Sequence, residues 1–175
     1  MAGIGARIKK VAKGLSAQQA ADAFVLARED PASVSTAQRS KADEFEASVE
    51  AMFLMAAVDG DVSEEELAQL AASVDAFTSL EGKPGAKVDT PKMLVALDDK
   101  LSVDGWNKRL AAVAARLQDK EARAFAFRLA AGVAFVDDHV AHAEAAALEA
   151  MASALAISAD ESQEILYDVR EALFE

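Results

Sequence analysis

Two short acidic segments hold the residue types best suited to chemistry. Residues 59–66 read Asp-Gly-Asp-Val-Ser-Glu-Glu-Glu, and residues 137–144 read Asp-Asp-His-Val-Ala-His-Ala-Glu, 78 positions later. Each segment begins with an acid and ends with a Glu. Carboxylate oxygens are preferred ligands of calcium, magnesium and manganese, and imidazole favours transition metals. The repeat makes these segments candidate metal-ligating turns.

The first turn is similar to the second half of an EF-hand calcium loop. Four loop positions are filled by suitable residues, namely Asp59, Gly60, Ser63 and Glu66. Two further ligand positions fall on Met55 and Ala57, which offer no side-chain oxygen. The first turn alone would therefore not hold calcium.

A complete site requires the two turns to face each other. Four carboxylates would then converge, with two further side chains at the rim. The expected ligand set is Asp59, Asp61, Glu66, Asp137, His142 and Glu144. Without a cation, four neighbouring carboxylates would raise one another's pKa. We expect calcium, magnesium or manganese here, and zinc less readily.

A purely structural interpretation of the turns stays open. Ser63 and Glu66 have the spacing of a capping box, in which each side chain satisfies an amide of the other residue. In the second turn Ala141 replaces the serine, yet Glu144 would still favour a helix N-terminus through the helix dipole. In that case His139 and His142 are exposed polar residues.

The composition predicts an all-α fold. Hydrophobic residues make up 53% of the chain, many of them Ala, while Gly (8) and Pro (3) are scarce. We expect a compact bundle of about seven to nine helices with an internally duplicated helix-hairpin core. The expected helices span residues 3–15, 17–29, 37–58, 63–77, 91–101, 106–117, 120–136, 141–156 and 159–174.

Three local features refine this expectation. The buried face of the helix at 37–58 is expected to comprise Phe45, Val49, Met52, Phe53 and Ala56. Asp119 is a candidate N-cap, and Asp104-Gly105 is a candidate joint. Ser158 and Glu161 have the spacing of a second capping box.

Charge divides the chain into two expected parts, an extension at residues 1–36 and a helical domain at residues 37–175. The net charge is −12, but residues 1–41 carry a net +4 and the remainder a net −16. The acidic body argues against nucleic-acid partners and favours cations or basic proteins. The basic amphipathic helix at 3–15 has three alternative contacts, namely a membrane surface, a partner protein or its own domain.

Cysteine usage and apolar runs bear on the compartment. The chain has no cysteine, and no apolar run exceeds eight residues, far short of a bilayer span. No signal peptide is recognisable at the N-terminus. We expect a cytoplasmic protein that is soluble or peripheral to a membrane.

Three stretches resemble the tellurite-resistance TerB-like family. They are residues 55–67 (MAAVDGDVSEEEL), residues 97–130, and residues 134–144 together with 155–161 (LAISADE). The likeness covers about residues 40–175 and implies an all-helical, internally duplicated domain. The acidic positions that match the family pattern are Asp59, Glu66, Asp137 and Glu144. The chain departs from that pattern at Asp138, where the second turn would have Gly, and at both histidines.

The resemblance implies a role in resistance to tellurite and other stress, often beside membrane partners. Related domains also form the N-terminal part of membrane-anchored DnaJ-type co-chaperones. We therefore expect a non-enzymatic, metal-binding or scaffold module. The alternative is a protein-interaction or membrane-peripheral adaptor with structural turns. Catalysis is disfavoured, because neither histidine has the Glu-x-x-His spacing of di-iron sites and no Gly-x-Ser-x-Gly, phosphate-loop or HExxH motif occurs.

Overall fold

The computed structural model describes residues 32, 35–58, 62–78, 90–135 and 142–174. Within these ranges the chain forms seven α-helices and no strand, which confirms the predicted all-α class. The helices are α3 (Thr36–Ala56), α4 (Glu64–Thr78), α5 (Thr90–Asp104), α6 (Trp106–Arg116), α7 (Lys120–Ala134), α8 (His142–Ala154) and α9 (Ala159–Phe174). The helices predicted at 3–15 and 17–29 lie outside the described residues. No helix in the described ranges is long and apolar enough to cross a bilayer.

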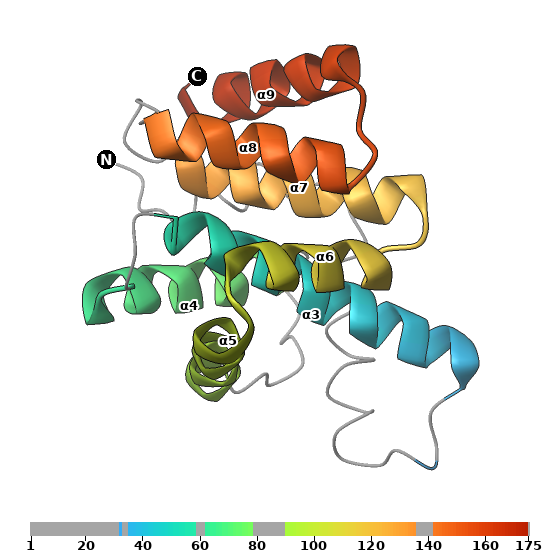
Figure 1. Ribbon diagram of the computed structural model, residues 1–175, viewed down its shortest axis with the longest axis vertical. Coiled ribbons are helices and arrows are strands. Elements are labelled where there is room, and N and C mark those ends of the chain that lie inside the picture. Colours follow the sequence, from blue (N-terminus) through green and yellow to red (C-terminus); the bar gives the residue numbers. More distant parts are fainter. Residues whose placement is uncertain (1–31, 33–34, 59–61, 79–89, 136–141, 175) are drawn as a thin grey trace.

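Helices α3 and α7 run side by side through the middle of the molecule (Figure 1). Their contact is the most extensive between any two described helices, and α6 packs along a second side of α3. Helices α4 and α5 lie on one side of the central pair, and α8 and α9 lie on the other (Figure 1). Both central helices end at the same end of the molecule, at the left of Figure 1.

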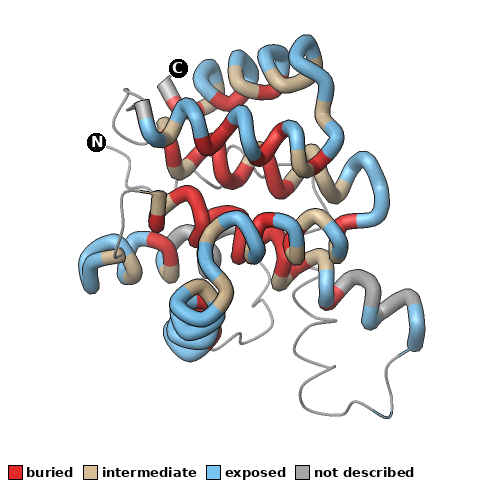
Figure 2. The backbone as a smooth tube through the Cα atoms, in the orientation of Figure 1, coloured by how far each residue is buried: buried red, intermediate tan, exposed pale blue. Residues whose placement is uncertain are grey.

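The second half of helix α3 is buried on all sides, whereas Thr36, Arg39 and Asp43 in its first half are exposed. Every residue from Ala47 to Met55 is buried, as Figure 2 shows for the centre of the bundle. Four of the five residues predicted for the buried face, Phe45, Val49, Met52 and Phe53, are buried, and Ala56 is partly exposed. The burial extends beyond that face to the residues between them. The reason is that α3 supplies two cores. One core involves α6 to α9 and takes Ala47, Ala51, Leu54 and Met55, and the other involves α4 and α5 and takes Phe45, Val49, Met52 and Phe53.

Small side chains line the contact between the central helices. Ala47 and Ala51 of α3 share a core with Ala126, Ala130 and Ala134 of α7, all of them buried. Because an alanine projects only a methyl group, the two helices can approach closely along this line. The extensive contact of α3 with α7 agrees with the alanine-rich faces of the sequence.

Two helix starts follow the sequence predictions. The Asp119 carboxylate accepts a hydrogen bond from the Ala122 amide at 2.7 Å and caps α7. Gly105 separates α5 from α6 with φ 87° and ψ 162°, a conformation that is essentially restricted to glycine. The predicted joint therefore needs glycine for its backbone conformation. It does not need glycine for space, since nothing lies within 4 Å of the position of an added Cβ.

We expect Gly105→Ala to lower the free energy of unfolding by about 1–3 kcal/mol, because alanine is strained at this φ and ψ. Urea denaturation of the full chain measures the loss. Val103→Ala is the control, since Val103 is 84% exposed in the last turn of α5. Equal stability of the Gly105 variant and the unmodified chain would contradict the strain argument.

Candidate functional site

The described residues include the side chains of two of the six predicted ligands. Asp59, Asp61 and Asp137 lie outside the described residues, and so does His139. His142 is the first residue of α8, and no position is described for its side chain. Glu66 and Glu144 are described, each in the first turn of its helix. Among the described residues, no group of three or more His, Cys, Asp and Glu side chains is arranged to hold a metal ion.

Glu66 forms the predicted capping box with Ser63. The Glu66 amide donates to Ser63 Oγ at 3.1 Å, and the Ser63 amide donates to Glu66 Oε2 at 3.0 Å. Both residues are exposed. A carboxylate has two oxygens and about four acceptor sites, so this hydrogen bond leaves Glu66 with the capacity to coordinate a cation as well.

The second predicted box, at Ser158 and Glu161, is formed on one side. Ser158 Oγ accepts from the Glu161 amide at 3.2 Å. The Glu161 carboxylate instead makes an ion pair with Lys120 Nζ at 3.0 Å. This pair joins the starts of α7 and α9, so the sequence pattern predicts the cap while the fold redirects the carboxylate.

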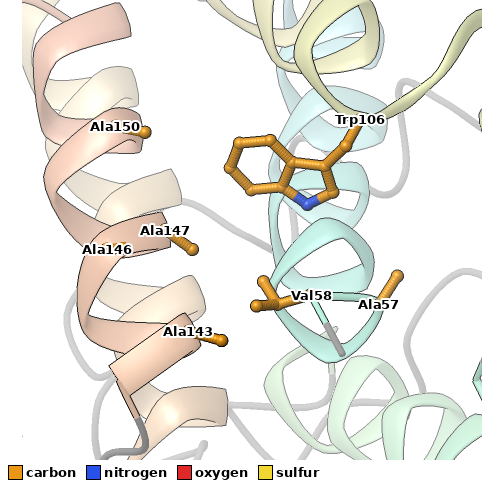
Figure 3. A pocket seen from close by; sticks show the side chains of 7 residues that line it. All are labelled: Ala57, Val58, Trp106, Ala143, Ala146, Ala147 and Ala150. Carbon is orange, nitrogen blue, oxygen red and sulfur yellow. The ribbon is translucent and has the colours of Figure 1, made fainter. Parts of the chain in front are cut away.

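An apolar pocket lies between the end of α3, the start of α6 and one face of α8. Its volume is about 420 Å³. The lining residues are Ala57, Val58, Trp106, Ala143, Ala146, Ala147 and Ala150. Figure 3 shows the Trp106 ring and the α8 alanines on opposite sides of the pocket. Val58 immediately precedes the first acidic turn and Ala143 lies within the second repeat, so the pocket joins the flanks of both turns.

Trp106 is held in place by a polar contact at the end of α3. Its Nε1–H donates to the carbonyl oxygen of Leu54 at 2.8 Å. The Val58 amide bonds to the Met55 carbonyl at 3.4 Å, a contact of the tighter i+3 type. The indole therefore satisfies a carbonyl at the helix C-terminus that lacks its usual intrahelical amide.

A buried ion-pair network joins α3 to α6 and was not predicted. The Glu50 side chain is 1% exposed. Its carboxylate accepts hydrogen bonds from Arg109 Nε at 2.6 Å and from Arg109 Nη2 at 2.8 Å. Arg116 Nη2 also donates to Glu50. Around this centre, Asp104 pairs with Arg109, and Glu46 pairs with Arg116 and with Lys100. All buried side-chain nitrogen and oxygen atoms in the described ranges have a hydrogen-bond partner.

The network keeps Arg109 charged. Its hydrogen bond with Glu50 raises the pKa of Arg109 well above the ordinary value; burial opposes the shift and Asp104 adds to it. A base whose pKa is higher in the folded than in the unfolded state stabilises the fold fully at pH values below the unfolded-state pKa. This stability is lost only as the pH rises through the folded-state pKa. For an arginine that window lies in strong alkali. The positive half of the pair is therefore constant at physiological pH.

Two features of the sequence point to the residues of this ion-pair network. Glu50 is an acid inside the apolar stretch 47–55, and it stands four residues after Glu46. Arg109 and Arg116 are seven residues apart, which places both on one helix face. What the sequence lacks is the information that these two faces meet. Trp106 is the only tryptophan, but its contact with Leu54 depends in the same way on how α6 packs on α3.

We expect Glu50→Gln to lower the free energy of unfolding by on the order of 3 kcal/mol, because two arginines lose their buried counter-charge. Glu46→Gln is the matched control on the same helix. Its side chain is 27% exposed, and we expect a loss of about 1 kcal/mol or less. Urea denaturation compares the two variants, and equal losses would contradict the dominance of Glu50.

We expect Ser63→Ala to cost about 1 kcal/mol of unfolding free energy through loss of the cap. Glu66→Gln should cost only about 0.5 kcal/mol, because glutamine still accepts the Ser63 amide in a capping box. Glu65→Gln removes a charge from the same turn outside the box and is the control. If Ser63→Ala matched Glu65→Gln in thermal and urea unfolding, the box would not stabilise α4.

Comparison of the chain with protein-family models, with curated proteins and with solved structures finds no match in any of the three. The likeness to the TerB-like family accordingly stands on the three sequence stretches described above.

Proposed function

We propose that this chain is a non-enzymatic module of the TerB-like type, with a divalent metal bound between its two acidic turns. Its role would be that of a scaffold in the response to tellurite or other chemical stress, near membrane-associated protein partners. The proposal includes an internally duplicated core, in which α3–α4 and α7–α8 are the two helical hairpins, followed by α5 and α9 respectively.

One observation carries the proposal furthest. Val58, just before the first acidic turn, and Ala143, in the first turn of α8, line the same pocket. The two central helices also end at the same end of the molecule (Figure 1). Both acidic segments are therefore attached close to one place, which is the arrangement that a shared site between the turns requires.

The described acids fit this role chemically. Glu66 and Glu144 each stand in the first turn of a helix, where the dipole stabilises a negative charge. With the aspartates of the two turns they would offer an oxygen-rich site suited to calcium, magnesium or manganese. A contribution from His142 would shift the preference towards a transition metal.

An interaction module with structural turns is the second candidate. The observation that favours it is the capping box, which gives Ser63 and Glu66 a purely structural task. In that case no metal is bound at the turns, and the apolar pocket is the surface that would bind a protein partner.

Calorimetric titration of the chelator-stripped full chain with calcium, manganese and zinc tests the metal site. We expect saturable binding that weakens on the order of tenfold or more, about 1.4 kcal/mol, in Glu66→Gln and in Glu144→Gln, because each removes a charged ligand. Glu65→Gln and Glu149→Gln are matched controls on α4 and α8, and they should bind as the unmodified chain does.

The variants make the outcome specific. Glu66→Gln keeps the cap acceptor, so a loss of metal affinity reports the charge rather than a frayed helix. Loss in both variants would support one shared site. Absence of saturable binding by the unmodified chain would overturn the metal proposal and leave the interaction module.

A further inference from the structure

The pocket beside Trp106 presents uncovered apolar surface. Ala143, Ala146 and Ala150 are exposed, and Val58 and Trp106 are half-buried. The volume of about 420 Å³ lies within the range of about 300–1,000 Å³ typical of ligand pockets. The methyl groups of α8 form a shallow wall, against which a helix backbone can lie closely (Figure 3).

The walls of the pocket are held rigidly. The indole of Trp106 is fixed to the Leu54 carbonyl, and α6 is fixed to α3 through Arg109 and the buried Glu50. A pocket that is already shaped loses little conformational entropy when it is filled. An occupant therefore has to match the existing shape and charge of the pocket, because the walls do not rearrange to fit it.

The chain on two sides of the pocket is acidic, while α6 behind Trp106 carries the exposed Lys108 and the ion-paired Arg109. Two stretches adjoin the lining, residues 59–78 after Val58 and residues 136–154, which include the lining on α8. Together they contain ten Asp and Glu and no Lys or Arg. Within α8 the charged residues are Glu144 and Glu149. An occupant that combines apolar side chains with basic neighbours is favoured here over a neutral or acidic one.

The N-terminal segment has this chemistry. Its apolar side chains recur at helical spacing on one stripe, and four cations flank or oppose the stripe. The apolar residues are Ile4, Ile8, Val11 and Leu15, and the cations are Arg7, Lys9, Lys10 and Lys13. Anchors at intervals of three and four residues are the pattern by which a helix fills an apolar groove.

The tether is long enough. Helix α3 has 21 residues, about 30 Å at 1.5 Å per residue, and the pocket lies at its C-terminal end. Residues 16–35 link the segment to α3. If residues 17–29 are helical they span about 20 Å, and the other seven add up to about 23 Å, so the reach is about 43 Å. Such a tether holds the segment at an effective concentration of the order of millimolar.

We propose that residues 3–15 dock as a helix in the pocket lined by Val58, Trp106 and the α8 alanines of the same chain. The apolar stripe fills the pocket, and the cations lie towards the acidic segments on either side. The pocket is thereby an intramolecular receptor for the N-terminal extension, and an external basic amphipathic helix would have to compete with it.

The single tryptophan reports occupancy directly. We would measure acrylamide quenching and the emission maximum of Trp106 in the full chain at low concentration, with chelator present so that the result is independent of metal. The double variant Ile4→Ser/Ile8→Ser should give a red shift and stronger quenching, because the indole becomes wetter. Ala6→Ser, on the opposite face of the predicted helix, should leave both values unchanged.

A second arm tests the pocket itself. A synthetic peptide of residues 1–15 should bind saturably to the Ile4→Ser/Ile8→Ser chain, reverse the red shift and bind more weakly as salt is raised. Adding Ala146→Arg to that chain should abolish peptide binding. Adding Ala145→Arg, at an exposed position of α8 outside the lining, should preserve it.

Three results would overturn the proposal. The first is unchanged Trp106 quenching in the isoleucine variant together with no peptide binding. The second is a quenching difference that appears only when size-exclusion chromatography shows a dimer, which would make a second copy the occupant. The third is binding of the residue 1–15 peptide to anionic vesicles but not to the Ile4→Ser/Ile8→Ser chain, which would make the N-terminal segment a membrane anchor.

Discussion

The buried carboxylate of Glu50 is the interaction on which the arrangement of α3 and α6 depends. Two arginines of α6 converge on it, and removing either charge would leave the other uncompensated in the interior. The orientation of α6 in turn sets the position of Trp106 at its first turn and the shape of the pocket beside α8. A structural ion pair in the core thus determines the geometry of a surface feature.

Both proposed sites lie at one end of the molecule. The central helices α3 and α7 both finish there (Figure 1). The acidic segments follow α3 and precede α8, and Val58 and Ala143 on their flanks line the apolar pocket. The acidic sequence on both flanks of this pocket underlies the two proposals, a cation between carboxylates and a docked basic amphipathic helix. The two proposals share the acidic segments, so a cation bound there would weaken the attraction of the basic helix.

Local features were predictable from the sequence, and contacts between distant helices were not. The capping box at Ser63 and the N-cap at Asp119 depend on residues three positions apart, so spacing alone reveals them. Glu50 and Trp106 acquire their roles only where α6 meets α3. The burial of residues 47–55 on every side of α3 needs both cores. Of the predicted metal ligands, Glu66 and Glu144 are placed near the ends of helices, while the site that would unite all six stays a prediction.

The complete burial of residues 47–55 of α3 has a consequence for biosynthesis. Its partner α7 ends 78 residues later in the chain, so at about 5–20 residues per second a ribosome needs roughly 4–16 s to complete the groove that covers α3. During that interval the stretch from Ala47 to Met55 has no complete shelter. The nascent chain therefore presents an apolar segment suited to holdase chaperones, and late truncations that remove α7 should be cleared by proteolysis rather than accumulate as a half-folded fragment.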